Sequence, residues 1–268
     1  MKTYTNKFEL PLHPGVVISN RLNNHAEAIL PALYPPTLHP GIIAWAEIKI
    51  RKFGKEVSSN WIEAWQNKAL RRNLMLTLLI LPVILFCTNY FFNYIQDSKS
   101  GILLNDLFLK WLPAKNVSIP ITFFMSSVIC LCVLRCISNP TMFTTALMAL
   151  SFLLIARIVT ISITRFFAPT GLIELKDPIC NLMYGSRCIT RDLFFSGHTA
   201  TLFILYLCSF KKVDKYYILF AVVSVGFLLL VQHVHYTVDV VCAPFFAFGC
   251  FWISKRIMKL QNANVKSR

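Results

Sequence analysis

The chain has 268 residues, of which 56% are hydrophobic and only 15% are charged, and its mean hydropathy is +0.57. Soluble domains carry about 25% charged residues, so this composition cannot cover a globular surface that faces water. It excludes an ordinary water-soluble enzyme, a disordered protein and a small disulfide scaffold. The formal net charge is +15, but the basic residues stand mostly beside apolar runs, where they orient membrane helices. We therefore expect no nucleic-acid partner.

Residues 1–72 differ from the rest of the chain. Prolines are concentrated in the first 40 residues, which indicates turns and extended chain. From Ile42 to Asn73 the pattern becomes helical and basic, with three tryptophans interleaved. Such a segment suits the surface of an anionic membrane, and a solvated helix that leads into the first span explains it equally well. We expect residues 1–72 to form a cytosolic N-terminal region.

Six apolar segments follow, each close to the length that crosses a membrane as a helix. They cover residues 74–94, 117–134, 142–163, 193–210, 216–231 and 238–253. The sequence therefore predicts an all-α polytopic membrane protein with six transmembrane helices, in a domain over residues 73–256 that is followed by a tail at 257–268. Lys and Arg near the span ends favour one side by a modest margin, which places both termini in the cytosol. The connections after the first, third and fifth spans then face the lumen or the exterior.

Two of the nine cysteines, Cys180 and Cys188, lie in the connection between the third and fourth spans. By the expected topology this connection is on the oxidising side of the membrane, where disulfides form. A disulfide between them and two free thiols are both open. Most of the other cysteines lie in or beside spans, where we expect them to be small packing residues.

The first candidate for chemistry is the tetrapeptide Ser196-Gly197-His198-Thr199, which opens the fourth span. Ser196 is a good helix N-cap, and Gly197 allows a ligand to approach the backbone. The unpaired N–H groups of a helix start form a site for phosphate, and His198 would stand beside it as a proton donor or acceptor. A capped helix with an interfacial histidine is the plainer interpretation.

The second candidate is the pair His235 and Asp239, which stand four residues apart at the start of the sixth span. This spacing puts both side chains on one helix face. A carboxylate on one imidazole nitrogen fixes the tautomer and makes the other nitrogen a better nucleophile or base. The alternative is a structural His–Asp pair in a packed bundle. Both candidates open on the same, non-cytosolic side of the predicted topology, which favours one joint site.

Together the two motifs resemble the pattern of the type 2 phosphatidic acid phosphatase superfamily. The stretches DLFFSGHT at 192–199 and HVHYTVDV at 233–240 look like the corresponding motifs of its sphingomyelin synthase branch. RIVTISIT at 157–164, with Pro169 after it, is similar to a third motif of that branch. The resemblance covers about residues 74–259.

The chain departs from the branch at three places. Val234 stands where the branch has an aspartate, Phe166-Phe167 replaces a Leu-Pro, and a proline-aspartate motif survives only as Asn105-Asp106. These differences leave open the headgroup and the choice between ceramide and diacylglycerol as acceptor.

The resemblance implies a lipid phosphotransferase. His235, oriented by Asp239, would attack the phosphorus of a glycerophospholipid headgroup and form a phosphohistidine. His198 would protonate the departing diacylglycerol and then deprotonate the hydroxyl of ceramide. The reaction implied by the family requires no metal or other cofactor; zinc held by the histidines and the aspartate is the alternative.

Other residues of these motifs are candidates for binding the phosphate or the substrate. Arg157 could counter the phosphate charge, or it could be a residue that snorkels from a span end. The full set of binding candidates is Arg157, Asp192, Ser196, Gly197, Thr199, His233 and Tyr236.

Two other functions compete with the transferase. The same site would make a lipid phosphate phosphatase or a phospholipase C if water were the acceptor, and a scaffold or transporter could retain the fold without catalysis. The expected partners are membrane lipids, and a homo-oligomer is left open. The resemblance implies a multi-pass protein of the Golgi or plasma membrane with its site on the lumenal or exoplasmic side.

Overall fold

The computed structural model describes residues 40–97, 101–176 and 189–266. The chain divides into two compact units, residues 1–63 and 64–268. The described part of the first unit belongs to helix α2 (Pro40–Gln66), which continues into the second unit. This helix exposes Trp45 and Ile48, and the Lys49 ammonium lies 4.2 Å from the centre of the Trp45 ring. Exposed basic and large apolar side chains are what a helix at a membrane surface presents.

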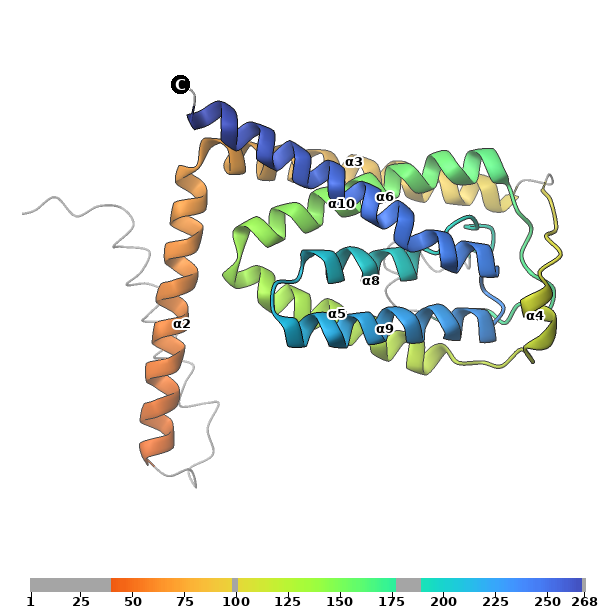
Figure 1. The fold of residues 1–268 in the computed structure, drawn as a ribbon, viewed down its shortest axis with the longest axis horizontal. Helices are drawn as coiled ribbons and strands as arrows, with labels where there is room; N and C mark the ends of the chain where they lie inside the picture. The colour runs from red at the N-terminus through yellow and green to blue at the C-terminus, as the bar shows by residue number, and fades with distance from the viewer. Residues whose placement is uncertain (1–39, 98–100, 177–188, 267–268) are drawn as a thin grey trace, which may run out of the picture. The chain divides into compact units, whose positions relative to one another are not determined.

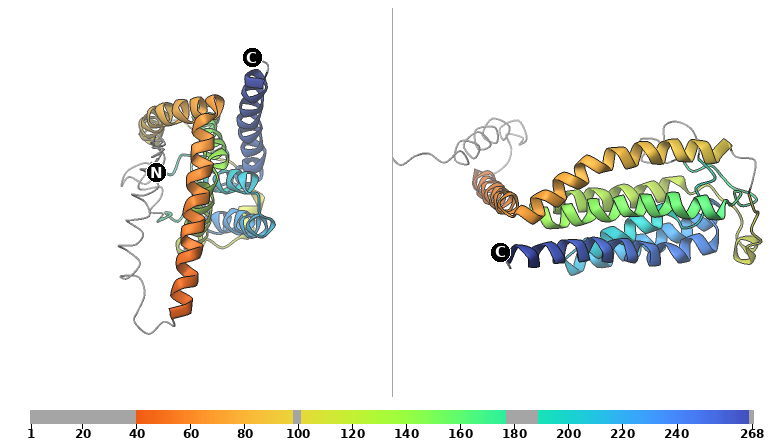
Figure 2. Two further views of the ribbon diagram at one scale, coloured as in Figure 1. Left: turned by 90° about the vertical axis from the view of Figure 1, so that its left-hand side faces the viewer. Right: turned by 90° about the horizontal axis from the view of Figure 1, so that it is seen from above.

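The second unit is a helical bundle (Figures 1 and 2). After α2 its helices are α3 (Lys68–Asp97), α4 (Leu107–Trp111), α5 (Ser118–Ser138), α6 (Pro140–Thr164), α8 (Gly197–Cys208), α9 (Lys212–Val231) and α10 (Thr237–Lys266). No strand occurs in the described ranges, where the one isolated bridge joins Ile102 to Phe166. The prediction of an all-α membrane protein agrees with this architecture.

Within the described residues, five helices are long and apolar enough to cross a membrane: α3, α5, α6, α9 and α10. They match five of the six predicted spans. The remaining segment, 193–210, forms α8, which has only 12 residues. At about 1.5 Å per residue, α8 is about 18 Å long and shorter than a hydrocarbon core of about 30 Å. The number of six spans therefore stays a prediction.

Helix α8 is short because both of its ends are fixed locally. Phe194 and Phe195, just before it, have φ angles of 76° and 37°, in the left-handed region. Ser196 then caps the helix by accepting a hydrogen bond from the Thr199 N–H. At the other end Ser209 is extended, with φ −72° and ψ 142°.

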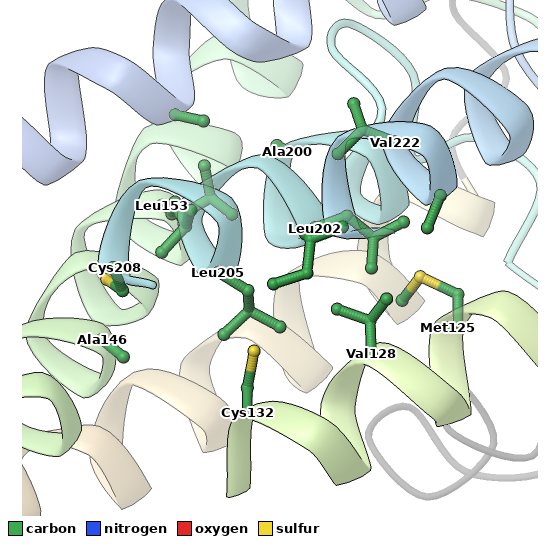
Figure 3. Packing of buried hydrophobic residues seen from close by; sticks show 14 of the residues in the cluster. Met125, Val128, Cys132, Ala146, Leu153, Ala200, Leu202, Leu205, Cys208 and Val222 are labelled. Carbon is green, nitrogen blue, oxygen red and sulfur yellow. The ribbon is translucent and has the colours of Figure 1, made fainter. Parts of the chain in front are cut away.

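The bundle encloses α8, which contacts α5, α6, α9 and α10. In Figure 3 its residues Leu202 and Leu205 point toward Val128 and Cys132 of α5. Leu153 of α6 belongs to the same buried cluster. Because other helices surround α8, its unpaired terminal backbone groups need not face lipid.

The two ends of the bundle differ in composition. At one end Asn139 terminates α5 and caps α6, and Arg135 binds Asp214 of α9 with hydrogen bonds of 2.7 and 3.0 Å. The start of α3 meets the C-terminal part of α10 at this end, where Asn73 donates to the sulfur of Met258. The opposite end holds α4 and the connections around it (Figure 1). The two motifs lie at this opposite end.

Candidate active site

Asp239 joins the two motifs. It is the third residue of α10 and is fully buried. Its Oδ1 accepts a hydrogen bond of 3.2 Å from the Phe194 N–H, and its backbone carbonyl accepts one of 2.9 Å from the Ser196 N–H. The segment that leads into α8 is therefore bonded directly to the first turn of α10, although Ser196 and Asp239 are 43 positions apart in the sequence.

His235 contacts Asp239 as the spacing of four predicts. Its Nδ1 lies 3.3 Å from Oδ2 of Asp239, and only 1% of the residue is exposed. The same Oδ2 accepts a hydrogen bond of 3.0 Å from the Tyr236 N–H. If the carboxylate accepts the proton of Nδ1, the lone pair of His235 is on Nε2. This arrangement can present a nucleophilic nitrogen.

The N-terminus of α8 carries His198. Ser196 Oγ accepts hydrogen bonds from the N–H and the hydroxyl of Thr199, at 3.4 and 3.2 Å. Ser196 and Thr199 are buried, whereas His198, the second residue of the helix, is half-buried. A capped helix start with further backbone N–H groups attracts an anion.

Arg157 of α6 reaches the same helix start. Its guanidinium donates to the carboxylate and the carbonyl of Asp192, at 2.9 and 3.0 Å. It also lies so close to Gly197 that a Cβ there would overlap Nη1 and stand 2.7 Å from Cζ. The guanidinium further lies 5.3 Å from the centre of the Phe92 ring. A buried cation next to a helix N-terminus is a favourable place for phosphate.

The turn before α8 is strained, because aromatic residues rarely adopt a left-handed backbone. Packing holds it in place: the Phe195 ring stacks on that of Phe246 at 4.4 Å, and the Phe194 ring meets those of Phe246 and Phe166 edge to face. Strain of this kind is found at functional sites, where the surrounding structure fixes an unfavourable geometry.

Asp106 supports the site and was not among the predicted site residues. It caps α4, and it also accepts hydrogen bonds from the N–H and the hydroxyl of Thr237, at 2.6 and 3.1 Å. Burial raises the pKa of this carboxyl, but the hydrogen bonds from Thr237, Leu109 and Phe108 outweigh it, so the pKa lies below its ordinary value. The signal in the sequence was Asn105-Asp106, which resembles part of a proline-aspartate motif.

Gln232 also fixes the connection between α9 and α10, and sequence reasoning missed it. Its side chain is completely buried and bonds the Val117 N–H, the hydroxyl of Ser118 and the carbonyls of Ile173 and Glu174. A polar residue at the end of an apolar span was the only signal for it.

Tyr236 and His233 bind backbone groups of other segments. The Tyr236 hydroxyl donates to the Phe167 carbonyl at 2.9 Å and accepts from the Leu104 N–H at 3.3 Å. Burial raises the pKa of this phenol, which keeps its proton available for donation. The His233 ring contacts the carbonyls of Thr170 and Leu112.

The remaining site predictions concern the cysteines and a metal. Cys180 and Cys188 lie outside the described residues. Within the described ranges, no group of three or more His, Cys, Asp or Glu side chains is arranged to hold a metal ion.

Comparison with known proteins adds one finding. Residues 190–256 match the family model described as PAP2 superfamily C-terminal. The match supports the type 2 phosphatidic acid phosphatase superfamily. No curated protein and no solved structure matches the chain.

The matched part of the chain includes both motifs. It contains Asp192, His198, His235 and Asp239. The superfamily is enzymatic and comprises phosphatases and phosphotransferases. An enzyme that acts on membrane lipids therefore fits both the domain and the apolar helices. The match does not separate the sphingomyelin synthase branch from the others.

Proposed function

We propose that the chain is a membrane lipid phosphotransferase that moves a phosphorylated headgroup from a glycerophospholipid to ceramide. Phosphocholine is the headgroup that we propose. The observation that carries the proposal is the contact between the motifs at Asp239, which orients His235 and also holds the segment that starts α8. A nucleophile oriented by a carboxylate, next to a helix start with a buried arginine, is a suitable arrangement for phosphoryl transfer.

The first step forms a bond between Nε2 of His235 and phosphorus and breaks the bond between phosphorus and the diacylglycerol oxygen. His198 donates the proton that this oxygen takes up. Arg157 and the N–H groups of α8 stabilise the charge on the phosphoryl oxygens.

The second step reverses the roles. The hydroxyl oxygen of ceramide attacks phosphorus, its proton passes to His198, and the bond between phosphorus and His235 breaks. Each histidine returns to its starting state, so the cycle needs no other reactant.

The surroundings of the motifs favour a lipid over water as acceptor. Phe166, Phe194 and Phe246 form a continuous set of aromatic rings, and the N–H of Phe194 bonds Asp239. Val234 lies in the same turn as His235. An apolar surface binds the chains of a lipid acceptor, and a hydroxyl that is oriented in this way reaches effective molarities of about 10⁵ M and above.

The test uses the purified full chain in vesicles of phosphatidylcholine with a labelled headgroup and fluorescent ceramide. We expect ceramide to accelerate headgroup release and most of the label to appear in new sphingolipid. Equal release without an acceptor, giving mainly free phosphocholine, would identify a hydrolase instead.

Variants test the roles of the histidines in the same assay. His235→Ala removes the nucleophile and should abolish turnover. His198→Ala should reduce turnover by about 100-fold or more, which is the range supplied by general acid–base catalysis. Asp239→Asn should leave a small residual activity, because the wrong tautomer of His235 is favoured. His25→Ala, outside both motifs, is the matched control and should keep wild-type activity. Substantial turnover in His235→Ala would contradict the mechanism.

A further inference from the structure

His233 occupies an unusual position in the connection between α9 and α10. Its backbone is left-handed, with φ 56°, and its side chain is buried. Nδ1 lies 3.0 Å from the carbonyl oxygen of Thr170, and Nε2 lies 3.0 Å from that of Leu112. Thr170 follows α6 and Leu112 follows α4, so one imidazole links two separate segments to the turn that carries His235.

Both partners of the ring are acceptors. A carbonyl oxygen cannot donate, and a neutral imidazole has a single N–H, whereas the imidazolium has two. The neutral ring would therefore turn the lone pair of one nitrogen toward a carbonyl oxygen only 3.0 Å away, where the two lone pairs repel each other, and it would lose that hydrogen bond. Only the protonated ring makes both bonds at once.

The neighbouring backbone is shaped to admit this ring. Gly171 has φ 81°, and a Cβ added to it would lie 3.3 Å from Nδ1 of His233. A side chain at this position would be strained and would crowd the ring.

Charged groups stand on every segment that contacts the ring, but no ion pair joins His233 to a described residue. These groups are Lys110 and Lys115 near Leu112, Arg165, Glu174 and Lys176 near Thr170, His235 and Asp239 on its own turn, and Asp106 at Thr237. The two carbonyls are thus the polar partners of the ring.

We propose that His233 is a positioning residue, which in its imidazolium form fixes the His235 turn to the segments at Leu112 and Thr170, and that loss of its proton releases one of these two links. The effect on turnover rests on the proposed function, because it acts through His235. The link itself is measurable without any reaction.

The first test is nuclear magnetic resonance of the full chain in nanodiscs with ¹⁵N-labelled histidine, in which His233→Gln assigns the signal. In the folded protein at mildly acidic pH we expect both ring nitrogens of His233 to carry protons. A single protonated nitrogen at every pH at which the protein is folded would overturn the proposal.

The second test is limited trypsin digestion, which reads cleavage after Lys110 and Lys115 from about pH 5 to about pH 8, the range in which imidazole side chains in general change charge. In the wild type we expect cleavage to accelerate as pH rises. His233→Gln should be cleaved quickly at all pH values, and His233→Arg, which keeps its charge, should be cleaved slowly throughout. Cleavage after Lys212, at the other end of the bundle, is the internal control and should not respond to either variant.

A wild-type profile as flat as that of His233→Gln would contradict the proposal. The activity profile gives the functional readout: His233→Arg should retain more of its activity at alkaline pH than the wild type does. If the chain proves to have no transferase activity, the resonance and digestion results still decide whether the link exists. If His233→Arg does not fold, the resonance measurement alone decides it.

Discussion

The missing side chain of Gly197 determines whether the Arg157 guanidinium can reach the candidate phosphate site. A buried arginine within a membrane protein needs polar partners, and Asp192 provides them. The guanidinium can lie against the start of α8 only because Gly197 has no side chain.

Replacement of Gly197 by alanine should therefore displace the guanidinium. We expect Gly197→Ala to lower kcat/KM in the vesicle assay by about 100-fold, the cost of misplacing a catalytic group by about 1 Å. The matched control is Gly249→Ala on α10, where a Cβ meets nothing within 4 Å. This control should keep its activity and gain up to about 1 kcal/mol from helix propensity. Equal activity of the two variants would exclude a role for Arg157 at this helix start.

Asp106 stabilises the start of α10, where its carboxylate accepts hydrogen bonds from Thr237. The pKa of its carboxyl is lower in the folded protein than its ordinary value of 3.8. Ionised Asp106 therefore stabilises the folded protein at any pH above 3.8, and this contribution is lost as the pH falls through the pKa of the folded state. We expect Asp106→Asn to lower the midpoint of thermal unfolding at neutral pH. The difference between the midpoints at neutral and at acidic pH should be smaller than in the wild type. Unfolding of the two proteins, followed by circular dichroism in detergent, measures this. Parallel pH profiles would contradict it.

Among the elements, α9 touches the first turn of α10, which carries Asp239, at Gly226. A Cβ on Gly226 of α9 would stand 2.9 Å from Cγ1 of Val240, which follows Asp239 in the chain. The Val240 side chain can therefore lie against α9 at this point only because Gly226 has no Cβ.

A double-mutant cycle tests this contact. Gly226→Ala should lower stability by about 1–3 kcal/mol, as overpacking does, and it should also lower activity. In the background of Val240→Ala, which removes Cγ1, the same substitution should cost less, with a coupling of about 0.5–3 kcal/mol between the sites. Thermal unfolding of the four proteins gives the coupling. Additive effects would show that the two helices do not depend on this contact.

For the molecule as a whole, the topology of six spans with both termini in the cytosol stays a prediction. The start of α3 and the C-terminal part of α10 meet at one end of the bundle, whereas both motifs lie at the other. Helix α8 leaves the site and α9 returns to it (Figure 1), so α8 with its flanking residues would complete a sixth crossing.

Epitope tags test this topology. Tags at either terminus should be accessible to antibody or protease from the cytosol, and a tag inserted at Asp177 should be accessible only from the opposite side. We would measure accessibility before and after selective permeabilisation of the membrane. A cytosolic tag at Asp177 would place the site on the wrong leaflet for the proposed reaction.

Features that depend on neighbouring residues could be predicted from the sequence. Apolar runs gave five helices of membrane-spanning length, and the spacing of four put His235 against Asp239. Ser196 caps α8 as expected from its residue type. Hydrophobic periodicity, capping and helix spacing are local properties of the chain, so they can be read from the sequence.

Contacts between residues that are distant in the sequence became visible only in the packed bundle. It limited the fourth apolar segment to the 12 residues of α8, and it brought Asp106 to Thr237, Gly197 to Arg157 and His233 to two carbonyls from different segments. Such contacts depend on how whole helices approach one another and on where each connection ends. No pattern within a single segment encodes them, because each partner lies on a part of the chain whose position is fixed by the packing of the others.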